Sequence, residues 1–379
     1  MKRSLLAVLA ALFFLSGCAA RGPAAQPSQS AAASSAVQSA PEPPAPTPSE
    51  EPAVPDTPEE RARALLADMT LEEKAGQLFF ARCPAENAAQ DVSAYHLGGY
   101  ILFGRDTKGK TACGLIWDIA SYQEAADIPL LIGVDEEGGS VVRVSSNSNL
   151  RERKFQSPRA VYSAGGIDGV LADAHEKDLL LRGLGFNVNL APVADVSTDP
   201  GDFIYDRTLG EDAQTTAGYV SAVTEQMARD GMGSVLKHFP GYGNNPDTHT
   251  GSAVDDRPLE TFQTSDFLPF SAGLSSSRTA AVLVSHNIVR CMDPELPASL
   301  SPAVHQTLRE LMTQAGRANG VVMTDDLAMD AVEQYAQDGS AAVLAVQAGN
   351  DLLISSDYRA QIPQVLVAAQ DGTLDTALI

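Results

Sequence analysis

The sequence contains little cysteine, with four residues in 379. Beyond Cys18 these are Cys83, Cys113 and Cys291, an odd number that leaves at least one thiol unpaired within the chain, and their spacing matches no metal-binding pattern. We therefore predict that they are mostly buried, small apolar side chains. The sequence also lacks a nucleotide-binding loop and a metal-binding triad, so we expect neither a cofactor nor a metal.

Basic residues are scarce relative to acidic ones. There are 26 Lys and Arg against 48 Asp and Glu, which gives a formal net charge of −22 at pH 7. The first 55 residues are balanced in charge, so the whole excess lies in the rest of the chain. Such acidity argues against binding to nucleic acid and against adsorption to anionic lipid.

One apolar run near the N-terminus, Leu5 to Leu15, follows Lys2 and Arg3 and is too short for a typical membrane-spanning helix. It ends in Leu-Ser-Gly-Cys at 15–18, which resembles a bacterial lipobox, in which the cysteine becomes the lipidated first residue. The alternative is an ordinary secretory signal with a chance cysteine. We predict a lipoprotein signal peptide over residues 1–18, lipidation of Cys18 and an extracytoplasmic protein that is lipid-anchored to the bacterial cell membrane.

Two further regions follow the predicted signal peptide. Residues 19–55 are rich in Ala, Pro, Ser and Glu, with almost no large apolar side chain, and are expected to form a disordered, Pro-stiffened linker. Residues 56–379 are long enough for one large α/β domain.

Short apolar runs alternate with helical patterns in this domain, and a capping box at Thr70–Glu73 begins the helix before the first run. Alternation predicts a parallel sheet, and eight runs predict a single catalytic domain with a (β/α)8 TIM-type barrel. Further helices are expected at Gly218–Asp230 and Asp338–Gly349. The eight runs are Gln77–Arg82, Gly99–Phe103, Pro129–Asp135, Phe186–Asp195, Gly233–His238, Ala280–His286, Gly320–Asp325 and Asp351–Ser355.

Polar residues stand at the C-terminal ends of several runs. Active sites lie at this face of essentially all barrel enzymes. Helix capping explains one or two such residues but not six, so we predict a site there. The six residues are Asp135, Asp195, Lys237, His238, His286 and Asp325.

The loop after the fifth run contains an Asp-x-His pair, Asp247 and His249, in a stretch rich in Gly, Pro and Asn. An Asp two residues before a His can hydrogen-bond one ring nitrogen, which fixes the tautomer and tunes the basicity of the imidazole. Such a His can act as a general acid and base near neutral pH. The alternative is a solvated loop with an incidental His.

The seventh run ends in two carboxylates, Asp325 and Asp326. Adjacent strand residues point to opposite faces, so at most one of them can point into a shared cavity while still on the strand. The other is expected in a loop or at a helix N-cap. Alternatively, both cap a following helix from Leu327 to Ala336.

Together these motifs resemble glycoside hydrolase family 3, in its single-domain β-N-acetylglucosaminidase subgroup, from roughly Thr70 to the C-terminus. The subgroup has Lys-His-Phe-Pro-Gly-His-Gly, then Asp-Ser-His, and later Asp-Asp-Leu or Asp-Ala-Leu with a Met. Two departures are visible: Tyr242 stands where the subgroup has His, and the chain stops at Ile379 where relatives continue through a final helix. The matching segments are Gly98–Phe103, Asp135–Gly139 with Arg143, Asn189–Asp195, Asp206–Gly210, Lys237–Gly243, Asp247–His249, Pro297–Ser301 and Asp325–Met329.

The resemblance implies glycosidic bond cleavage with retention, with Asp325 as the nucleophile and His249, supported by Asp247, as the acid and base. It also implies that Asp135 binds sugar hydroxyls. Structural salt bridges are the alternative for the two arginines among the remaining ligands. The residues expected to hold the sugar ring and its 2-acetamido group are Arg143, Arg207, Lys237 and His238.

The function implied is an exo-β-N-acetylhexosaminidase that releases terminal β-linked GlcNAc from peptidoglycan fragments or chitooligosaccharides. Alternatives are a β-glucosidase or a glycoside phosphorylase on the same barrel, and a catalytically inactive sugar-binding lipoprotein. The Asp-x-His loop favours the acetamido sugar, and the intact catalytic residues argue against an inactive protein. The expected partners are an oligosaccharide or muropeptide substrate and the membrane through the lipid anchor, with no nucleic acid, and a monomer is expected.

Overall fold

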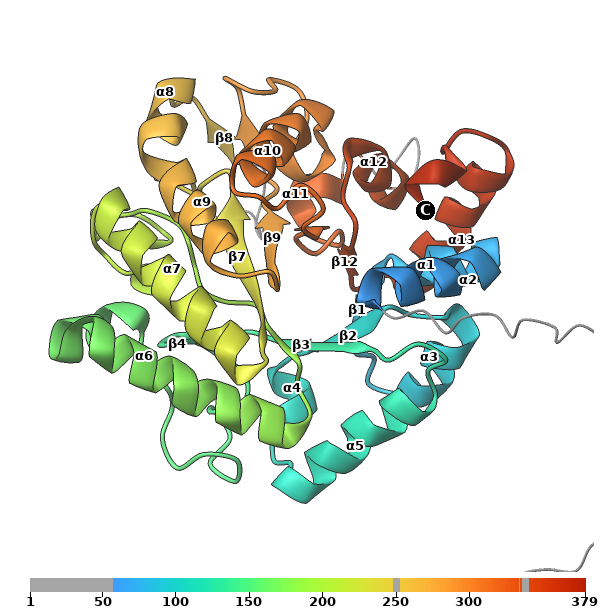
Figure 1. The fold of residues 1–379 in the computed structure, drawn as a ribbon, viewed down its shortest axis with the longest axis horizontal. Coiled ribbons are helices and arrows are strands. Elements are labelled where there is room, and N and C mark those ends of the chain that lie inside the picture. The colour runs from blue at the N-terminus through green and yellow to red at the C-terminus, as the bar shows by residue number, and fades with distance from the viewer. Residues whose placement is uncertain (1–56, 248–252, 334, 336–340) are drawn as a thin grey trace, which may run out of the picture. The chain divides into compact units, whose positions relative to one another are not determined.

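The computed structural model describes residues 57–247, 253–333, 335 and 341–379. Eight parallel strands form one sheet in the order β11-β9-β7-β6-β3-β2-β1-β12. A bridge between Met323 and Leu352 joins the first strand of this order to the last, so the sheet closes into the predicted barrel (Figure 1). The strands are β1 (Phe79–Arg82), β2 (Gly99–Leu102), β3 (Leu131–Val134), β6 (Val188–Asn189), β7 (Gly233–Phe239), β9 (Ala280–Val284), β11 (Val322–Thr324) and β12 (Leu353–Ser355).

Helices surround the sheet (Figure 1). Helices α1 (Pro58–Asp68) and α2 (Leu71–Gln77) precede β1, and one longer helix follows each barrel strand. These are α3 (Ala88–Tyr95), α5 (Ala112–Glu124), α6 (Pro158–Leu184), α7 (Ala213–Asp230), α9 (Phe267–Ser276), α10 (Pro302–Gln314), α12 (Ala341–Ala348) and α13 (Tyr358–Gln370). The short strands in the connections are β4 (Glu136–Gly138), β5 (Val141–Val142), β8 (Val254–Asp255) and β10 (Ile288–Val289). The short helices are α4 (Gly104–Thr107), α8 (Leu259–Thr261), a π-helix (Phe262–Asp266), α11 (Asp330–Glu333) and 3-10 helices at Tyr205–Arg207, Ala298–Leu300 and Thr376–Leu378.

Two apolar layers hold the barrel together. Phe80 lies in the cluster inside the barrel, whereas its neighbours Phe79 and Ala81 pack with the outer cluster of strand and helix residues, as strand alternation requires. Gly133 makes room for the ring of Phe80, because a Cβ at this position would lie 2.4 Å from it. Burial on both faces explains why the strands are continuous apolar runs. The inner cluster contains Phe80, Ile101, Val188, Leu190, Val235, Ala281, Leu283, Met323 and Ile354.

Helix ends follow their capping residues. The predicted capping box is present, since Thr70 Oγ1 accepts from the Glu73 amide at 3.2 Å and Glu73 Oε2 accepts from the Thr70 amide at 2.7 Å. Helix α7 begins at Ala213, five residues before the predicted start, because Asp212 caps it with a 2.8 Å hydrogen bond from the Thr215 amide.

The cysteine prediction is wrong for two of the three residues. Cys83 is buried, but Cys113 and Cys291 are exposed, and all three thiols are free. Cys113 lies in the first turn of α5, and Cys291 lies in a turn after β10. The predicted signal peptide, Cys18 and linker lie outside the described residues. Within the described part of the chain, we find no helix with the length and apolarity that a membrane span requires.

Candidate active site

A cavity of about 640 Å³ lies at the C-terminal ends of the barrel strands. It gathers every predicted catalytic and sugar-binding residue that the structure describes: Asp135, Arg143, Arg207, Lys237, His238, Asp247 and Asp325. His249, the predicted acid and base, lies outside the described residues. Other residues that line the cavity are Arg82, Ile101, Phe103, Glu137, Ser140, Val141, Leu190, Phe203, Asp206, Leu283, Asp326, Met329 and Ile354.

A network of four ionised side chains forms one wall of the cavity. Lys237 Nζ lies 2.7 Å from both Asp135 Oδ1 and Glu137 Oε1. Arg207 binds Glu137 through two parallel hydrogen bonds, Nε to Oε2 at 3.0 Å and Nη2 to Oε1 at 2.8 Å. This bidentate geometry is the strongest that a guanidinium and a carboxylate form. Arg207 thus takes part in a salt bridge, which was the structural alternative for this residue.

Burial acts against the charges of this network, and the pairing overcomes it. Burial alone would raise the pKa of Glu137, but Arg207 and Lys237 together hold that pKa well below its usual range. Burial alone would lower the pKa of Lys237, but Asp135 and Glu137 raise it above its usual value. Both groups therefore stay charged, and Glu137 is a site residue that the sequence motif contained but that had no predicted role.

His238 is held between a carboxylate and a guanidinium. Its Nδ1 lies 2.7 Å from Asp195 Oδ2, and its Nε2 lies 3.2 Å from Arg207 Nη2. A guanidinium can only donate, so Nε2 accepts and the hydrogen lies on Nδ1, which donates to Asp195. Asp195 Oδ1 also accepts from the amide of Tyr242 at 2.7 Å. The ring of His238 thus orients Arg207, while Asp195 joins the end of β7 to the following loop.

Tyr242 is buried at the base of the loop that carries Asp247. Its hydroxyl donates to the Pro246 carbonyl at 3.2 Å, and its ring lies edge-on to His238 with 5.5 Å between centroids. Tyr242 also packs on Phe203 at 5.7 Å. A tyrosine at this position therefore connects the start of the loop to the residue just before Asp247.

A second cluster of charged residues holds the same loop in place. Arg257 donates to Asp255, to Asp266 and to the Gly241 carbonyl, and Asn245 donates to Asp255 Oδ2 at 2.8 Å. Burial raises the pKa of Asp266 to about 6, although Arg257 opposes the rise. Sequence reasoning gave Asn245, Asp255, Arg257 and Asp266 no role, because the contacts among them depend on how the loop folds back.

Asp325 and Asp326 both follow β11 but have different surroundings. Asp325 donates its amide to the Val284 carbonyl at 3.1 Å, and its Oδ1 accepts from the Asp326 amide at 2.9 Å. Asp326 Oδ1 accepts from the amides of Ala328 and Ser356, and its Oδ2 accepts from the Ser356 hydroxyl. Asp326 therefore shapes a turn, and the next described helix, α11, begins at Asp330 rather than at the predicted Leu327.

His286 supports this turn from inside the protein. Its Nε2 lies 3.0 Å from the Asp326 carbonyl, which can only accept, so Nε2 carries the hydrogen. Nδ1 then accepts from the Ser299 hydroxyl at 2.6 Å. His286 is fully buried and does not line the cavity, so its place is behind the wall rather than in the site.

Two arginines on another part of the wall have no carboxylate partner among the described residues. The Nε atoms of Arg82 and Arg143 are buried without a hydrogen bond there, and the two guanidinium carbons lie 4.5 Å and 6.0 Å from the centroid of Phe103. Glu136 fixes the backbone at Arg143, because its Oε2 accepts from the Arg143 amide at 2.8 Å. Arg82 was not predicted as a site residue, although a charged residue at the C-terminal end of an apolar strand indicates the active-site face of a barrel.

The arrangement can bind a small polar molecule with an apolar face. Side chains of the inner barrel cluster, such as Ile101, Leu190 and Leu283, also line the cavity, and charged groups surround them. A sugar ring has polar edges and apolar C–H faces, which suits this lining. Carboxylates at Asp247 and Asp325 supply groups for nucleophilic and acid–base chemistry.

Comparison with known proteins agrees with this chemistry. The sequence model described as the glycosyl hydrolase family 3 N-terminal domain matches residues 70–379. The β-hexosaminidase LpqI of Mycobacterium tuberculosis is 32% identical over 289 residues, which cover 74% of this chain and 71% of that protein. A β-hexosaminidase of Xanthomonas campestris pv. campestris is 31% identical over 288 residues, which cover 75% and 84% of the two chains.

The fold is similar to that of solved family 3 enzymes. The structure of a family 3 β-N-acetylglucosaminidase from Paenibacillus sp. matches with a TM-score of 0.74 and 29% sequence identity. The match covers 82% of this chain and 60% of the Paenibacillus chain. The family match over most of the chain, the barrel and the relatives agree, and the chain belongs to glycosyl hydrolase family 3 and is a glycoside hydrolase.

Proposed function

We propose that this enzyme is a retaining exo-β-N-acetylhexosaminidase that releases terminal β-linked GlcNAc from peptidoglycan fragments or chitooligosaccharides. The observation that carries the proposal is that Asp325 and Asp247 line the same cavity as a fixed ion network and two arginines, Arg82 and Arg143, whose Nε atoms have no hydrogen-bond partner among the described residues. The β-hexosaminidase and β-N-acetylglucosaminidase names of the similar proteins support the choice of an acetamido sugar.

Asp325 is the proposed nucleophile. Its Oδ1 accepts from the Asp326 amide at 2.9 Å, which orients the carboxylate at the cavity wall. A carboxylate oxygen attacks the anomeric carbon, the bond to the leaving oxygen breaks, and a covalent glycosyl-aspartate forms. Water then breaks this ester, and the sugar leaves with the configuration that it had in the substrate.

His249 and Asp247 are the proposed acid–base pair. In the first step protonated His249 donates to the leaving oxygen, and in the second step neutral His249 takes a proton from water. Asp247 stabilises the imidazolium, because a nearby carboxylate favours the charged form. The hydrogen bond from Tyr242 to the Pro246 carbonyl supports this role, since it fixes the backbone next to Asp247.

The sugar-binding groups divide into acceptors and donors. Asp135 and Lys237 form an ion pair at the cavity wall, so one can accept from and the other donate to neighbouring sugar hydroxyls. Arg143 and Arg82, whose Nε atoms have no partner in the part of the chain that the structure describes, are the proposed donors to the acetamido carbonyl or to a substrate carboxylate. His238 acts by orienting Arg207, because both of its ring nitrogens are already engaged.

The decisive assay compares p-nitrophenyl β-GlcNAc with p-nitrophenyl β-glucoside, each with and without inorganic phosphate. We expect turnover of the GlcNAc compound, little of the glucoside, no sugar phosphate, and a β-anomer as the first product in NMR spectra. A sugar phosphate product would indicate the glycoside phosphorylase, preference for the glucoside would indicate a β-glucosidase, and an α-anomer would exclude retention.

The location of the enzyme is proposed from its N-terminal sequence. A lipid on Cys18 and a linker over residues 19–55 would hold the enzyme outside the cell at the membrane, where peptidoglycan fragments occur. Cys18→Ala should release the protein from the membrane fraction or leave an unprocessed precursor. Normal processing with unchanged membrane association would contradict the lipid anchor.

A further inference from the structure

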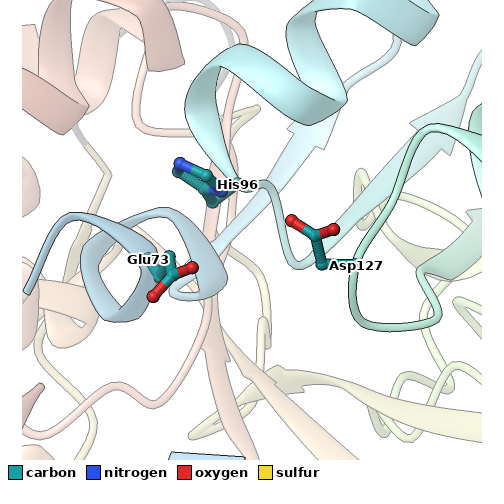
Figure 2. A group of neighbouring side chains, drawn as sticks. All are labelled: Glu73, His96 and Asp127. Atoms are coloured by element: carbon teal, nitrogen blue, oxygen red, sulfur yellow. The ribbon is translucent and has the colours of Figure 1, made fainter. Parts of the chain in front are cut away.

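A group of possible metal ligands lies at the other end of the barrel. Glu73 is in the first turn of α2, His96 directly follows α3, and Asp127 lies in the connection from α5 to β3 (Figure 2). Each of the three precedes a barrel strand closely in sequence, so the group lies at the N-terminal face, away from the candidate active site. One ligand atom of each residue lies within 4.8 Å of the others.

The three side chains also share one cavity of about 190 Å³. Leu97 and Ile128 contribute apolar walls to it, and Asp68 adds a further carboxylate. The cavity therefore offers space for an ion with one or more water ligands beside the three side chains.

The ligand atoms are available for an ion. Neither carboxylate has an ion pair within the described part of the chain, and the ring nitrogens of His96 have no hydrogen bond there. The hydrogen bonds that Glu73 accepts from Thr70 use Oε2, and Oε1 accepts none among the described residues.

Two of the three segments are already fixed to each other. Gln77 Nε2 donates to the His96 carbonyl at 2.9 Å, and the Gly98 amide donates to the Gly76 carbonyl at 3.2 Å. Gly76 itself lies so close that a Cβ would be 2.0 Å from the Tyr95 carbonyl oxygen. The backbones that carry Glu73 and His96 are therefore fixed relative to each other, and the three ligand atoms, already within 4.8 Å of one another, can approach a common ion by side-chain rotation.

We propose that Glu73, His96 and Asp127 form a site for a divalent transition-metal ion, with Zn²⁺ as the ion of best fit. One imidazole nitrogen and two carboxylate oxygens suit Zn²⁺, which binds these atoms at about 2.0–2.2 Å in four-coordinate sites. Mg²⁺ and Ca²⁺ prefer sites made of oxygen alone. The ion connects α2, the end of α3 and the connection from α5 to β3, and at this face of a barrel it contributes to stability rather than to catalysis.

The test measures zinc binding and thermal unfolding of the full chain after treatment with a chelator and dialysis. Isothermal titration with ZnCl2 should show a saturable site, and zinc at a hundred times its dissociation constant should raise the unfolding midpoint by about 5 °C. MgCl2 and CaCl2 should raise it much less. An equal effect of Mg²⁺ would show that the imidazole is not a ligand and would overturn the proposal.

Two variants remove one ligand each. His96→Asn keeps a residue that tolerates the left-handed backbone at this position, where φ is +51°. Asp127→Asn changes an exposed side chain and should not impair folding. Both should weaken zinc binding at least tenfold and abolish the thermal shift, while turnover of p-nitrophenyl β-GlcNAc stays at the wild-type level.

Two controls separate this site from others. His175→Asn changes an exposed histidine on α6 and should leave zinc binding unchanged. His249→Ala removes the histidine of the active-site loop, which could bind zinc with Asp247, and the proposed site should remain in this variant. Zinc binding that is lost in His249→Ala but persists in His96→Asn and Asp127→Asn would overturn the proposal, as would the absence of any binding by the wild-type chain.

Discussion

The two ends of the barrel hold their charges differently. At the C-terminal end, Glu137 is buried and paired with Arg207 and Lys237, which lie 70 and 100 positions further along the chain. At the N-terminal end, Glu73 and Asp127 are partly or fully exposed and have no described ion-pair partner. Paired, buried charges fix groups where chemistry needs them, whereas exposed ligands keep the freedom to close on an ion.

This contrast separates catalysis from stability. Changes in the reactive groups of the C-terminal end should alter turnover and leave unfolding almost unchanged. Changes at the N-terminal end should alter stability alone, in line with the general division of labour in barrel enzymes. The ion network of Glu137 is an exception, because it lies at the catalytic end but is expected to contribute to the free energy of unfolding.

The largest effect is expected at Asp325. Asp325→Ala removes the proposed nucleophile and should lower turnover by several orders of magnitude, with the unfolding midpoint close to that of the wild type. Asp326→Asn should cost less turnover but more stability, because its carboxylate accepts from Ala328 and Ser356. Mass spectrometry of a trapped glycosyl-enzyme distinguishes the two, and a sugar found on Asp326 would overturn the assignment.

His249→Ala should have a large effect that depends on the leaving group. Loss of general acid assistance should cost about 10²–10⁴ in rate for a natural sugar leaving group. An activated nitrophenolate needs little protonation, so the glycosylation step should slow far less for it. Asp247→Asn should show a milder form of the same pattern in kcat/KM. Equal losses for good and poor leaving groups would mean that His249 only binds substrate or supports the loop.

The fold was predictable because its signals are local. Each barrel strand is an apolar run of a few residues, and the polar residue that follows, such as Asp135 or Asp325, marks the active-site end. The capping box at Thr70 was also readable, because both partners lie within four residues. Local pattern failed at Leu327, where hydrogen bonds from Ser356, thirty residues away, hold Asp326 in a turn.

The wall of the site was less predictable because its contacts are distant in sequence. Nothing in the neighbourhood of Glu137 shows that Arg207 and Lys237 will bind it. Exposure of Cys113 and Cys291 likewise depends on which side of an element faces solvent. The resemblance to a family supplied roles for single residues, whereas the pairing that fixes them required the structure.

Glu137→Gln tests the exception at the catalytic end. Loss of one partner from a buried ion pair should lower the free energy of unfolding by about 3–5 kcal/mol, because Arg207 and Lys237 keep buried charge without full compensation. Urea unfolding at pH 7 measures this change. Glu225→Gln, in an exposed pair with Arg229, is the matched control and should cost less than about 1 kcal/mol.

The same variant has a predicted pH dependence. Although burial opposes it, pairing with Arg207 and Lys237 lowers the pKa of Glu137 below the ordinary value of 4.5. A lowered pKa in the folded state contributes stability above the unfolded value and loses it as the pH falls. The difference between wild type and Glu137→Gln should therefore be full at pH 7 and shrink below pH 4.5. A difference that stays constant down to pH 3 would show that the charge of Glu137 is not the cause.

The smallest effect is expected at Arg143, and it should have opposite signs for binding and stability. Its buried Nε has no partner among the described residues, so Arg143→Met removes an unsatisfied donor and should leave the unfolding midpoint unchanged or slightly raised. A hydrogen bond from a charged group contributes about 1.5–3 kcal/mol, so KM for p-nitrophenyl β-GlcNAc should rise about 10- to 100-fold while kcat changes less. Arg290→Met, in an exposed pair with Asp256, is the matched control and should change neither quantity.

If Arg143 contacts the acetamido carbonyl, kcat/KM for the glucoside should fall less than kcat/KM for the GlcNAc compound. A loss of stability as large as the loss of binding would place Arg143 with the structural network of Glu137 instead of with the sugar ligands.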